Sequence, residues 1–258
     1  MKSMLAGASG FVGGNIAQQT QFSFYADSKN LKQAIGQHFD LVVFSAVPAV
    51  KWWANQNREA DRAVVQGLID FLSTISADRF VLISTVDVYQ ISQGVNERTE
   101  IETAQLHPYG QHRYWLECEV RRLFKHHHIV RLPALFGPGL KKNVLFDLIC
   151  CNMLEKINLD SEFQWYPLRR LWSDILQIID SGQPLVNLVV EPIQTREIHR
   201  AFFQNIHVGM EASAAARYDI HTVFSRQLGG KSDQYVLRSD EVMDELATWL
   251  TAPGVSCG

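Results

Sequence analysis

Short apolar runs alternate, in the first half of the chain, with longer stretches whose apolar residues recur at helical spacing. Short runs bounded by polar segments are typical of strands that are buried on both faces of a parallel sheet. They predict strands at Lys2–Ala6, Phe22–Tyr25, Leu41–Ser45, Phe80–Ser84 and Ile129–Leu132. Helices are predicted between these strands at Gly13–Gln19, Lys29–Gly36, Arg58–Ser76 and Tyr109–His126. This alternation indicates an α/β fold with right-handed crossovers and a doubly wound parallel sheet.

The pattern becomes less regular after Gly137. Helices are predicted there at Leu145–Ile157, Arg170–Ile179, Thr195–Gln204 and Ser239–Thr251, and one strand is predicted at Leu185–Val190. Ser239 is the expected N-cap of the last helix. The small and polar residues of Gly209–Ala216 indicate a mobile loop.

A G-x-x-G-x-x-G motif lies between the first strand and the first helix. Its first glycine permits a tight turn, its second lets the backbone approach a pyrophosphate, and its third lets the helix pack on the strand. The N-terminus of a helix favours negative charge, so phosphates are expected there. The motif predicts a dinucleotide-binding loop, with an ordinary strand-to-helix turn as the alternative. The expected binding residues are Gly7, Ser9, Gly10, Phe11, Val12 and Gly13.

The composition is that of an ordinary globular protein. The 258 residues carry a net charge of −3, so no basic excess points to a nucleic-acid or membrane partner. No apolar run is long enough to span a bilayer, and the chain starts in a predicted core strand, so we expect no leader. The four cysteines, at positions 118, 150, 151 and 257, lack the spacing of a zinc site. We expect reduced thiols, no metal and a cytoplasmic protein.

Three further segments carry candidate chemistry. The buried run Val81–Tyr89 ends in hydroxyl residues, Tyr109–Arg113 opens a helix, and Arg131–Gly139 runs from a strand into a loop of proline and glycine. Together with the glycine motif, these segments resemble the extended branch of the short-chain dehydrogenase/reductase superfamily, which acts mainly on nucleotide sugars. The resemblance covers residues 1–145 well and the rest loosely.

The resemblance implies a Rossmann domain that binds NAD or NADP, and a small C-terminal substrate domain. We place the first domain at residues 1–138 and the mainly substrate-binding region at 139–258, with segments of the latter allowed to return to the first. It also suggests a homodimer that pairs the helices Arg58–Ser76 and Tyr109–His126.

The resemblance assigns catalytic roles as well. Tyr109 matches the tyrosine that exchanges a proton with the substrate oxygen. Thr85 matches the hydroxyl residue that hydrogen-bonds this oxygen, and Ser84 is the alternative. Arg113 stands where the family usually has lysine, so it is expected to bind the nicotinamide ribose and to hold positive charge near Tyr109. A tyrosine needs such a charge because its ordinary pKa is near 10.

The segment that sets cofactor preference is short. Asp27 is expected to accept a hydrogen bond from a ribose 2′-hydroxyl, which would favour NAD, whereas Ser28, Lys29 and Asn30 would hold the 2′-phosphate of NADP. The next strand arrives so soon that the usual third strand of the sheet is expected to be missing. Two further sets complete the expected cofactor site: Ala46 and Val47 on the adenosine side, and Pro133 next to the nicotinamide carboxamide.

Residues for the substrate are assigned on weaker grounds. Asp87 follows Thr85 where the family's dehydratases have an Asp-Glu pair, but Val86 replaces the first acid, so we rank dehydration below reduction or epimerisation. A plain turn residue is the alternative for Asp87. The other candidates are Lys141, Lys142 and Asn143 near a substrate diphosphate, and Trp165 stacked on a base. A solvated loop and a core position are the respective alternatives.

The sequence thus predicts an NAD(P)-dependent oxidoreductase or epimerase that acts on a nucleotide-linked sugar. A non-catalytic NAD(P)-binding redox sensor or scaffold of the same fold is the main alternative. A reductase of a carbonyl compound other than a sugar is another, because the fold alone does not decide the substrate.

Overall fold

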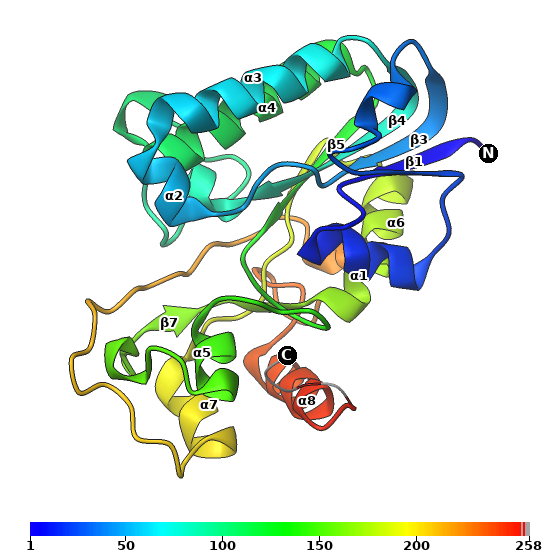
Figure 1. Ribbon diagram of the computed structural model, residues 1–258. Coiled ribbons are helices and arrows are strands. Elements are labelled where there is room, and N and C mark those ends of the chain that lie inside the picture. The colour runs from blue at the N-terminus through cyan, green and yellow to red at the C-terminus, as the bar shows by residue number, and fades with distance from the viewer. Residues whose placement is uncertain (254, 256–258) are drawn as a thin grey trace.

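A six-stranded parallel sheet organises the molecule (Figure 1). The computed structural model describes residues 1–253 and 255. The sheet has the order β2-β1-β3-β4-β5-β9, and every neighbouring pair is parallel. Its strands are β1 (Ser3–Ala6), β2 (Phe24–Ala26), β3 (His38–Phe44), β4 (Ser76–Thr85), β5 (His127–Leu132) and β9 (Leu185–Asn187).

The edge of this sheet differs from the usual Rossmann order, in which a further strand lies outside the second one. Here the three-residue strand β2 is itself the edge within the described part of the chain. The chain then returns directly to β3 on the other side of β1. The sheet is therefore doubly wound but narrower on its cofactor side, as the short segment after β2 predicts.

Helices cover both faces of the sheet because successive strand residues point to opposite sides. On one face, α3 (Arg58–Leu72) and α4 (Pro108–Leu123) pack on the β-strand residues Val42, Phe44 and Leu82. On the other face, α1 (Phe11–Gln19) and α6 (Leu171–Ser181) pack on the alternate residues Leu41, Val43 and Val81. These helices lie on the two sides of the sheet in Figure 1.

Several predicted boundaries in this half need correction. Helix α1 begins at Phe11, two residues before the prediction. Helix α3 ends at Leu72 because the hydroxyls of Ser73 and Thr74 bond back to the carbonyls of Asp70 and Phe71, and β4 begins soon afterwards. The short helix α2 (Lys51–Gln56) was not predicted.

The predicted helix Lys29–Gly36 is wrong. This segment contains only a 3-10 turn at Leu31–Ala34. The Asp27 carboxylate accepts hydrogen bonds from the backbone N–H groups of Lys29 and Asn30, at 2.8 and 3.3 Å. Side chains of this kind compete with the helix for backbone donors, so they favour a turn.

In the part of the C-terminal region that the structure describes, two small sheets and three helices lie beyond the main sheet and its helix α6. Strands β6 (Ala134–Phe136) and β8 (Trp165–Pro167) are parallel, whereas β7 (Glu162–Phe163) and β10 (Ile193–Gln194) are antiparallel. The helices are α5 (Val144–Cys150), α7 (Thr195–Phe202) and α8 (Ser239–Leu250). Short 3-10 turns lie at Val86–Val88, Thr103–Gln105, Leu154–Lys156, Leu168–Arg170 and Arg226–Leu228. Between these elements, α6 and β9 return to the main sheet. The domain boundary between residues 138 and 139 stays a prediction.

Three expectations in the C-terminal region are corrected. Helix α5 ends at Cys150, because Cys151 adopts the left-handed conformation. The N-cap of α8 is Arg238 and not Ser239; the Glu241 carboxylate accepts the backbone N–H of Arg238 at 3.0 Å. The predicted strand Leu185–Val190 ends at Asn187.

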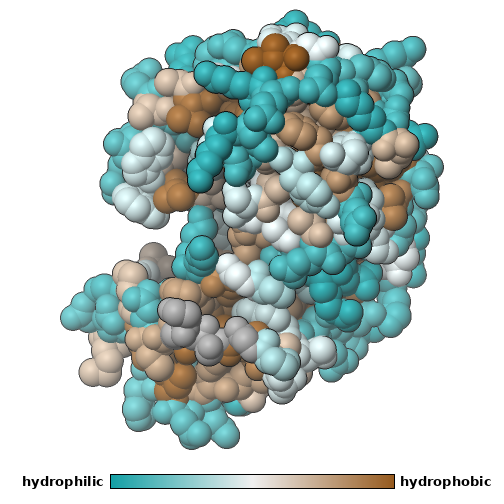
Figure 2. Space-filling model, turned by 45° about the vertical axis from the view of Figure 1, so that its right-hand side comes forward, coloured by the Kyte–Doolittle hydropathy of each residue, from teal (hydrophilic) through white to brown (hydrophobic). Residues whose placement is uncertain are grey.

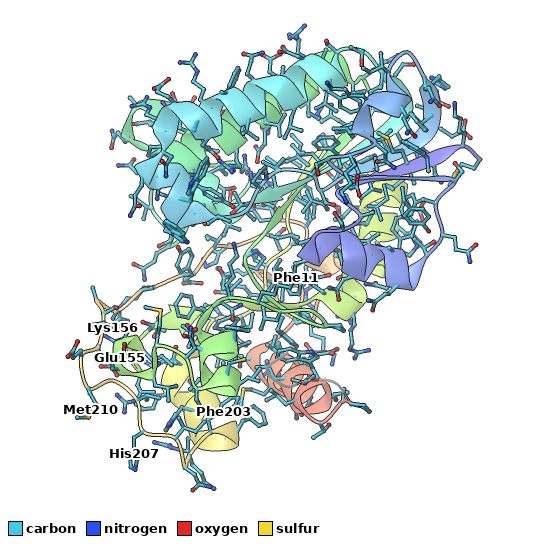
Figure 3. All side chains as sticks on the ribbon, viewed as in Figure 1. Phe11, Glu155, Lys156, Phe203, His207 and Met210 are labelled. Atoms are coloured by element: carbon cyan, nitrogen blue, oxygen red, sulfur yellow. The ribbon has the colours of Figure 1, made fainter. Side chains whose placement is uncertain are left out.

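The predicted loop Gly209–Ala216 has no helix or strand. Its backbone N–H groups at Gly209 and Glu211 donate to the carbonyls of Leu154 and Glu155. The Lys156 ammonium also pairs with the Glu211 carboxylate at 2.6 Å. Figure 3 shows Glu155, Lys156 and Met210 together, far from the sheet, so this loop lies away from the glycine motif near Phe11.

Cys118 and Cys151 are free, but Cys150 is disulfide-bonded, so the prediction of reduced thiols is wrong for Cys150. Cys257 lies outside the described residues. Across the described residues, no helix combines the length and the apolar character that crossing a bilayer requires.

Candidate active site

The glycine motif forms a tight connection at the carboxyl end of β1. Gly7 has φ +83°, and a Cβ atom there would lie 2.5 Å from the carbonyl oxygen of Ser45. A Cβ atom on Gly13 would lie 2.1 Å from the carbonyl oxygen of Gly7. These two glycines are therefore required by the packing of the loop itself.

Gly10 is different, because it is exposed and a Cβ atom there would meet only the Gly7 carbonyl oxygen, at 3.2 Å. It precedes α1, whose N-terminus has no side-chain cap and no acidic residue in its first turn. Backbone N–H groups at such a terminus attract phosphate oxygens. An open glycine beside an uncapped helix N-terminus fits a dinucleotide pyrophosphate, with Ser9, Phe11 and Val12 beside it.

The other predicted cofactor residues lie at the same edge of the sheet. Ala46 and Val47 follow β3 and are half-buried, as is Pro133 between β5 and β6. Asp27 directly follows β2, where its Oδ1 is held by backbone N–H groups. Asn30 is also engaged, because its side chain bonds the Asp27 N–H at 2.8 Å and the Tyr25 carbonyl at 3.0 Å. Ser28 and Lys29 remain exposed.

Tyr109 and Thr85 meet at the carboxyl end of β4. Thr85 is the last residue of that strand, and Tyr109 lies in the first turn of α4. The Thr85 hydroxyl is near enough to the Tyr109 hydroxyl to lower its pKa through a side-chain hydrogen bond. The Tyr109 N–H donates to Asn55 Oδ1 at 3.0 Å, and this bond fixes the start of the helix. The structure thus brings together the two hydroxyls that the sequence selected.

Ser84 is held elsewhere, because neighbouring residues of a strand point to opposite faces. Its hydroxyl donates to Glu117 Oε1 at 2.6 Å. Glu117 also pairs with the buried Arg131 guanidinium at 2.6 Å. Since the Ser84 hydroxyl belongs to this buried ion pair, Thr85 alone remains a candidate for the reacting oxygen.

Arg113 forms a buried cluster beneath Tyr109. Its guanidinium lies 4.1 Å from the centroid of the Tyr109 ring and bonds the Asp61 carboxylate and the Pro48 carbonyl. His112 Nδ1 lies 2.7 Å from the same carboxylate. Arg113 is only 3% exposed and cannot reach a nicotinamide ribose, so the prediction of this contact is wrong. The predicted positive charge beside Tyr109 is present.

The environment of Tyr109 contains opposing influences on its acidity. Burial raises its pKa above the ordinary value, whereas the charges of Arg113 and Lys51 and the bond with Thr85 lower it. The charge of Asp87 raises it. The neighbouring His107 has a lowered pKa, through burial and then the charge of Lys51, which favours a neutral imidazole. This suits its role as N-cap, because His107 Nδ1 accepts the Gly110 N–H at 3.0 Å.

Asp87 is paired with two residues that sequence reasoning missed. Lys51 Nζ lies 2.7 Å from Asp87 Oδ1 and 3.2 Å from the Tyr218 hydroxyl. The Tyr218 hydroxyl lies 3.1 Å from the same carboxylate oxygen. Lys51 lies shortly after β3, so its place at a strand end was a usable signal, but nothing local in the sequence singles out Tyr218.

The remaining substrate candidates differ in exposure and in how far their polar groups are already bonded. Lys141 is exposed, and the Lys142 ammonium bonds the Ala49 carbonyl. Asn143 caps α5 by accepting the Phe146 N–H at 3.1 Å and donates to the Leu135 carbonyl at 2.9 Å, so both ends of its amide are occupied. Trp165 is 1% exposed, so the prediction that it stacks on a substrate base is wrong. It belongs to the core because β8 is buried.

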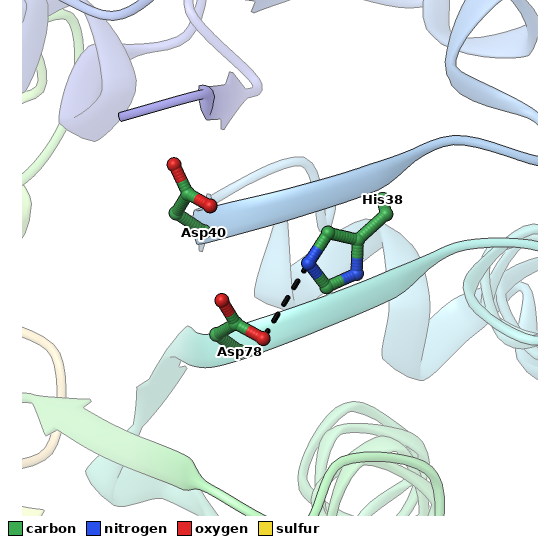
Figure 4. A group of neighbouring side chains, drawn as sticks. All are labelled: His38, Asp40 and Asp78. Atoms are coloured by element: carbon green, nitrogen blue, oxygen red, sulfur yellow. Dashed lines mark ion pairs between the residues drawn. The ribbon is translucent and has the colours of Figure 1, made fainter.

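Other polar groups lie at the amino ends of the strands, opposite the glycine motif. His38 and Asp40 of β3 and Asp78 of β4 have ligand atoms within 4.8 Å of one another, and His38 pairs with Asp78 (Figure 4). All three lie on the surface, and Asp40 already accepts the Lys2 N–H. A basic cavity of about 440 Å³ opens nearby, beside the C-terminal ends of α4 and α6. Cations stabilise such helix ends, so these groups have a structural explanation.

The geometry defines a Rossmann-type α/β protein with its candidate site residues at the carboxyl edge of the sheet. Figure 2 shows a notch between the larger lobe, which holds the sheet, and the smaller lobe. The model of the NAD dependent epimerase/dehydratase family matches residues 23–165, more than half of the chain. The chain belongs to this family, which confirms the resemblance seen in its motifs. No curated protein matches it in sequence.

Solved structures share the fold at low identity. A dTDP-4-dehydrorhamnose reductase from Yersinia enterocolitica is 12% identical, with a TM-score of 0.70 over 96% of this chain and 98% of that one. A UDP-N-acetylglucosamine 4-epimerase from Methanobrevibacter ruminantium is 11% identical, with a TM-score of 0.70 over 96% of both chains. A dTDP-4-dehydrorhamnose reductase from Bacillus anthracis in complex with NADP is 20% identical, with a TM-score of 0.68 over 85% of this chain and 89% of that one.

Proposed function

We propose that this protein is an NAD(P)-dependent oxidoreductase or epimerase that acts on a nucleotide-linked sugar. The observation that carries the proposal is the placement of Tyr109: its ring lies 4.1 Å from the Arg113 guanidinium, and Arg113 and Thr85 both lower the pKa of its hydroxyl against the effect of burial. Family membership and the nucleotide-sugar reductases and epimerases among the structural neighbours support the substrate class.

The residues at the carboxyl edge of the sheet have different proposed roles, in cofactor binding and in proton transfer. The glycine loop and the N-terminus of α1 would hold the pyrophosphate, and Asp27, with Ser28 and Lys29 beside it, would meet the ribose of the adenosine half. When bound, a nicotinamide nucleotide supplies the acceptor or donor of hydride. Tyr109 takes the proton from a substrate hydroxyl as it becomes a carbonyl, or returns it in the reverse direction. Thr85 donates a hydrogen bond to the same oxygen. The charge of Arg113 stabilises the phenolate form of Tyr109, which takes up the proton during oxidation and is left after the proton is returned during reduction.

Gly10→Val tests the cofactor site at the glycine with the most open surroundings, where a Cβ atom meets only the Gly7 carbonyl oxygen, at 3.2 Å. Valine at this exposed position would occupy the space above the helix N-terminus. We expect NADH or NADPH to bind the wild-type chain and the variant to lose most of this affinity in a fluorescence titration. Gly67→Val, at an open and exposed position of α3, is the matched control. Equal affinity in wild type and a folded Gly10→Val variant would reject the proposed cofactor site.

A non-catalytic NAD(P) sensor is the second candidate, and the buried state of Arg113 favours it. The family lysine is replaced by a guanidinium that is bonded to Asp61 and Pro48 and is closed to ligands. Turnover with a panel of nucleotide keto-sugars separates the two functions. Cofactor binding with no hydride transfer to any member of the panel would favour the sensor. A homodimer through α3 and α4 stays a prediction.

A further inference from the structure

Lys51, Asp87 and Tyr218 form a closed triangle of hydrogen bonds that the proposed chemistry does not use; we call it the polar triad. Lys51 opens α2, Asp87 lies in the turn after β4, and Tyr218 comes from the C-terminal region. The three contacts measure 2.7, 3.2 and 3.1 Å. Residues from both halves of the chain are therefore needed to complete the triad.

The triad keeps bonding capacity for a ligand. An ammonium group has three N–H donors, and the two contacts of Lys51 leave one. Both side-chain contacts of Asp87 go to Oδ1, and within the part of the chain that the structure describes Oδ2 accepts no hydrogen bond. The side chains of Lys51 and Asp87 are 39% and 20% exposed. One free donor thus lies next to one free acceptor, and solvent reaches both residues.

The triad is also close to the reacting hydroxyl and electrically balanced. The charges of both Asp87 and Lys51 act on the pKa of Tyr109, in opposite directions. One positive and one negative charge cancel, so the triad attracts neither an anion nor a cation at long range. Phe163 stacks on the Tyr218 ring, with centroids 5.8 Å apart, and keeps the phenol in position.

We propose that the polar triad binds two neighbouring hydroxyl groups of an uncharged sugar ring and thereby selects the sugar. One hydroxyl accepts the free N–H of Lys51, and the other donates to Asp87 Oδ2. Tyr218 is a positioning residue that orients Lys51 and Asp87. A carboxylate in place of the hydroxyl that donates to Asp87, or an amino group in place of the hydroxyl that accepts from Lys51, would meet a like charge, so sugars with these charges bind less well. This inference rests on the proposed function, because it concerns the sugar of the same substrate.

The test compares each nucleotide sugar with its own nucleoside diphosphate. Calorimetric titrations of the full chain, with and without cofactor, use UDP-glucose, dTDP-glucose and GDP-mannose beside UDP, dTDP and GDP. In the wild type we expect at least one sugar to bind more tightly than its diphosphate. Lys51→Met should reduce this advantage about tenfold, because a hydrogen bond from a charged group typically contributes that much. Tyr218→Phe should reduce it less, and the distant exposed variant Lys125→Met should leave it unchanged.

A second comparison uses a carboxylate on the ring. UDP-glucuronic acid should bind less tightly than UDP-glucose to the wild type, and Asp87→Asn should narrow that difference. The inference is overturned if Lys51→Met weakens sugar and diphosphate equally, or if no sugar binds better than its diphosphate to the wild type. A different result would reject the proposed function, namely that the wild-type protein binds neither NADH nor NADPH. Cofactor binding and turnover with an unchanged sugar advantage in Lys51→Met would reject the triad alone.

Discussion

Two charged clusters flank Tyr109, and they differ in their access to water. The cluster of Asp61, His112 and Arg113 lies between α3 and α4, with every side chain at most 4% exposed. The polar triad contains a similar ion pair, but its lysine is 39% exposed. Burial removes water that would stabilise an unpaired charge, so the first cluster is coupled to folding. The second keeps its charges in partial contact with solvent, so it is available to a ligand.

The comparison explains how a substitution at the family's lysine position is accommodated. A buried guanidinium needs partners for its N–H groups; Asp61 and the Pro48 carbonyl provide them for the two terminal nitrogens of Arg113, whereas its buried Nε has no partner among the described residues. The charge remains beneath the Tyr109 ring, at 4.1 Å from its centroid. Because Arg113 is buried, it cannot offer a ligand the hydrogen bonds that an exposed lysine would offer, whereas the partly exposed Lys51 supplies an ammonium group nearby.

The largest expected effect concerns Tyr109, which lies between the two clusters. Tyr109→Phe removes the proton carrier and keeps the ring that covers Arg113. We expect the rate of hydride transfer to fall about 10²–10⁴-fold, because that is the usual contribution of general acid–base catalysis. Cofactor affinity should change little. Steady-state kinetics with Tyr114→Phe, on the same helix, as control would check this; an unchanged kcat in Tyr109→Phe would reject Tyr109 as the acid–base residue.

The buried cluster is tested by Asp61→Asn, which leaves the Arg113 guanidinium without its counter-charge. Removing one partner of a buried ion pair typically costs about 3–5 kcal/mol, so we expect the free energy of unfolding to fall by that amount. Urea unfolding measures it. Asp70→Asn is the control, because Asp70 lies on the same helix but is exposed. Equal stabilities of the two variants would show that burial does not distinguish the cluster.

His107 tests the helix that carries Tyr109 and Arg113. Its pKa is below the ordinary value, so the unfolded chain takes up the proton first as the pH falls from about 6.5. The cap bond to Gly110 therefore stabilises the protein above this pH and is lost as the pH falls through the lower pKa of the folded state. A cap of this kind contributes about 1 kcal/mol.

Urea unfolding between pH 8 and pH 5 would check the cap, since asparagine can accept the same N–H at every pH. His107→Asn should lose less stability on acidification than the wild type. The exposed His126→Asn should keep the slope of the wild type. A His107→Asn variant with the wild-type slope would show that the cap does not titrate in this range.

The smallest expected effect is on the stability of the polar triad. Lys51→Met removes a partly exposed ion pair, which usually contributes about 0–1 kcal/mol. We therefore expect thermal and urea unfolding close to those of the wild type, in contrast to Asp61→Asn. A loss as large as that of Asp61→Asn would mean that Lys51 supports the fold, and the two clusters would then be alike.

The sequence by itself determined the elements of the sheet, the glycine loop and the pair Thr85 and Tyr109. Apolar runs reveal strands because burial follows a local pattern, and the residues that follow parallel strands gather at one edge of the sheet. The narrow edge at β2 was also visible, because too few residues separate it from β3. The helix predicted after β2 failed where side chains of Asp27 and Asn30 bonded the backbone.

Only the tertiary structure decided which charges are buried and which are open. The sequence showed an arginine at position 113 but not its partner Asp61, which lies on another helix. It also gave no sign that Lys51 and Tyr218, 167 positions apart, share one carboxylate. Trp165 and Asn143 were predicted to contact the substrate. In the structure Trp165 is buried in β8 and Asn143 caps α5. Local patterns specify helices and strands, whereas the burial and partners of a polar side chain depend on elements that the chain brings together only when it folds.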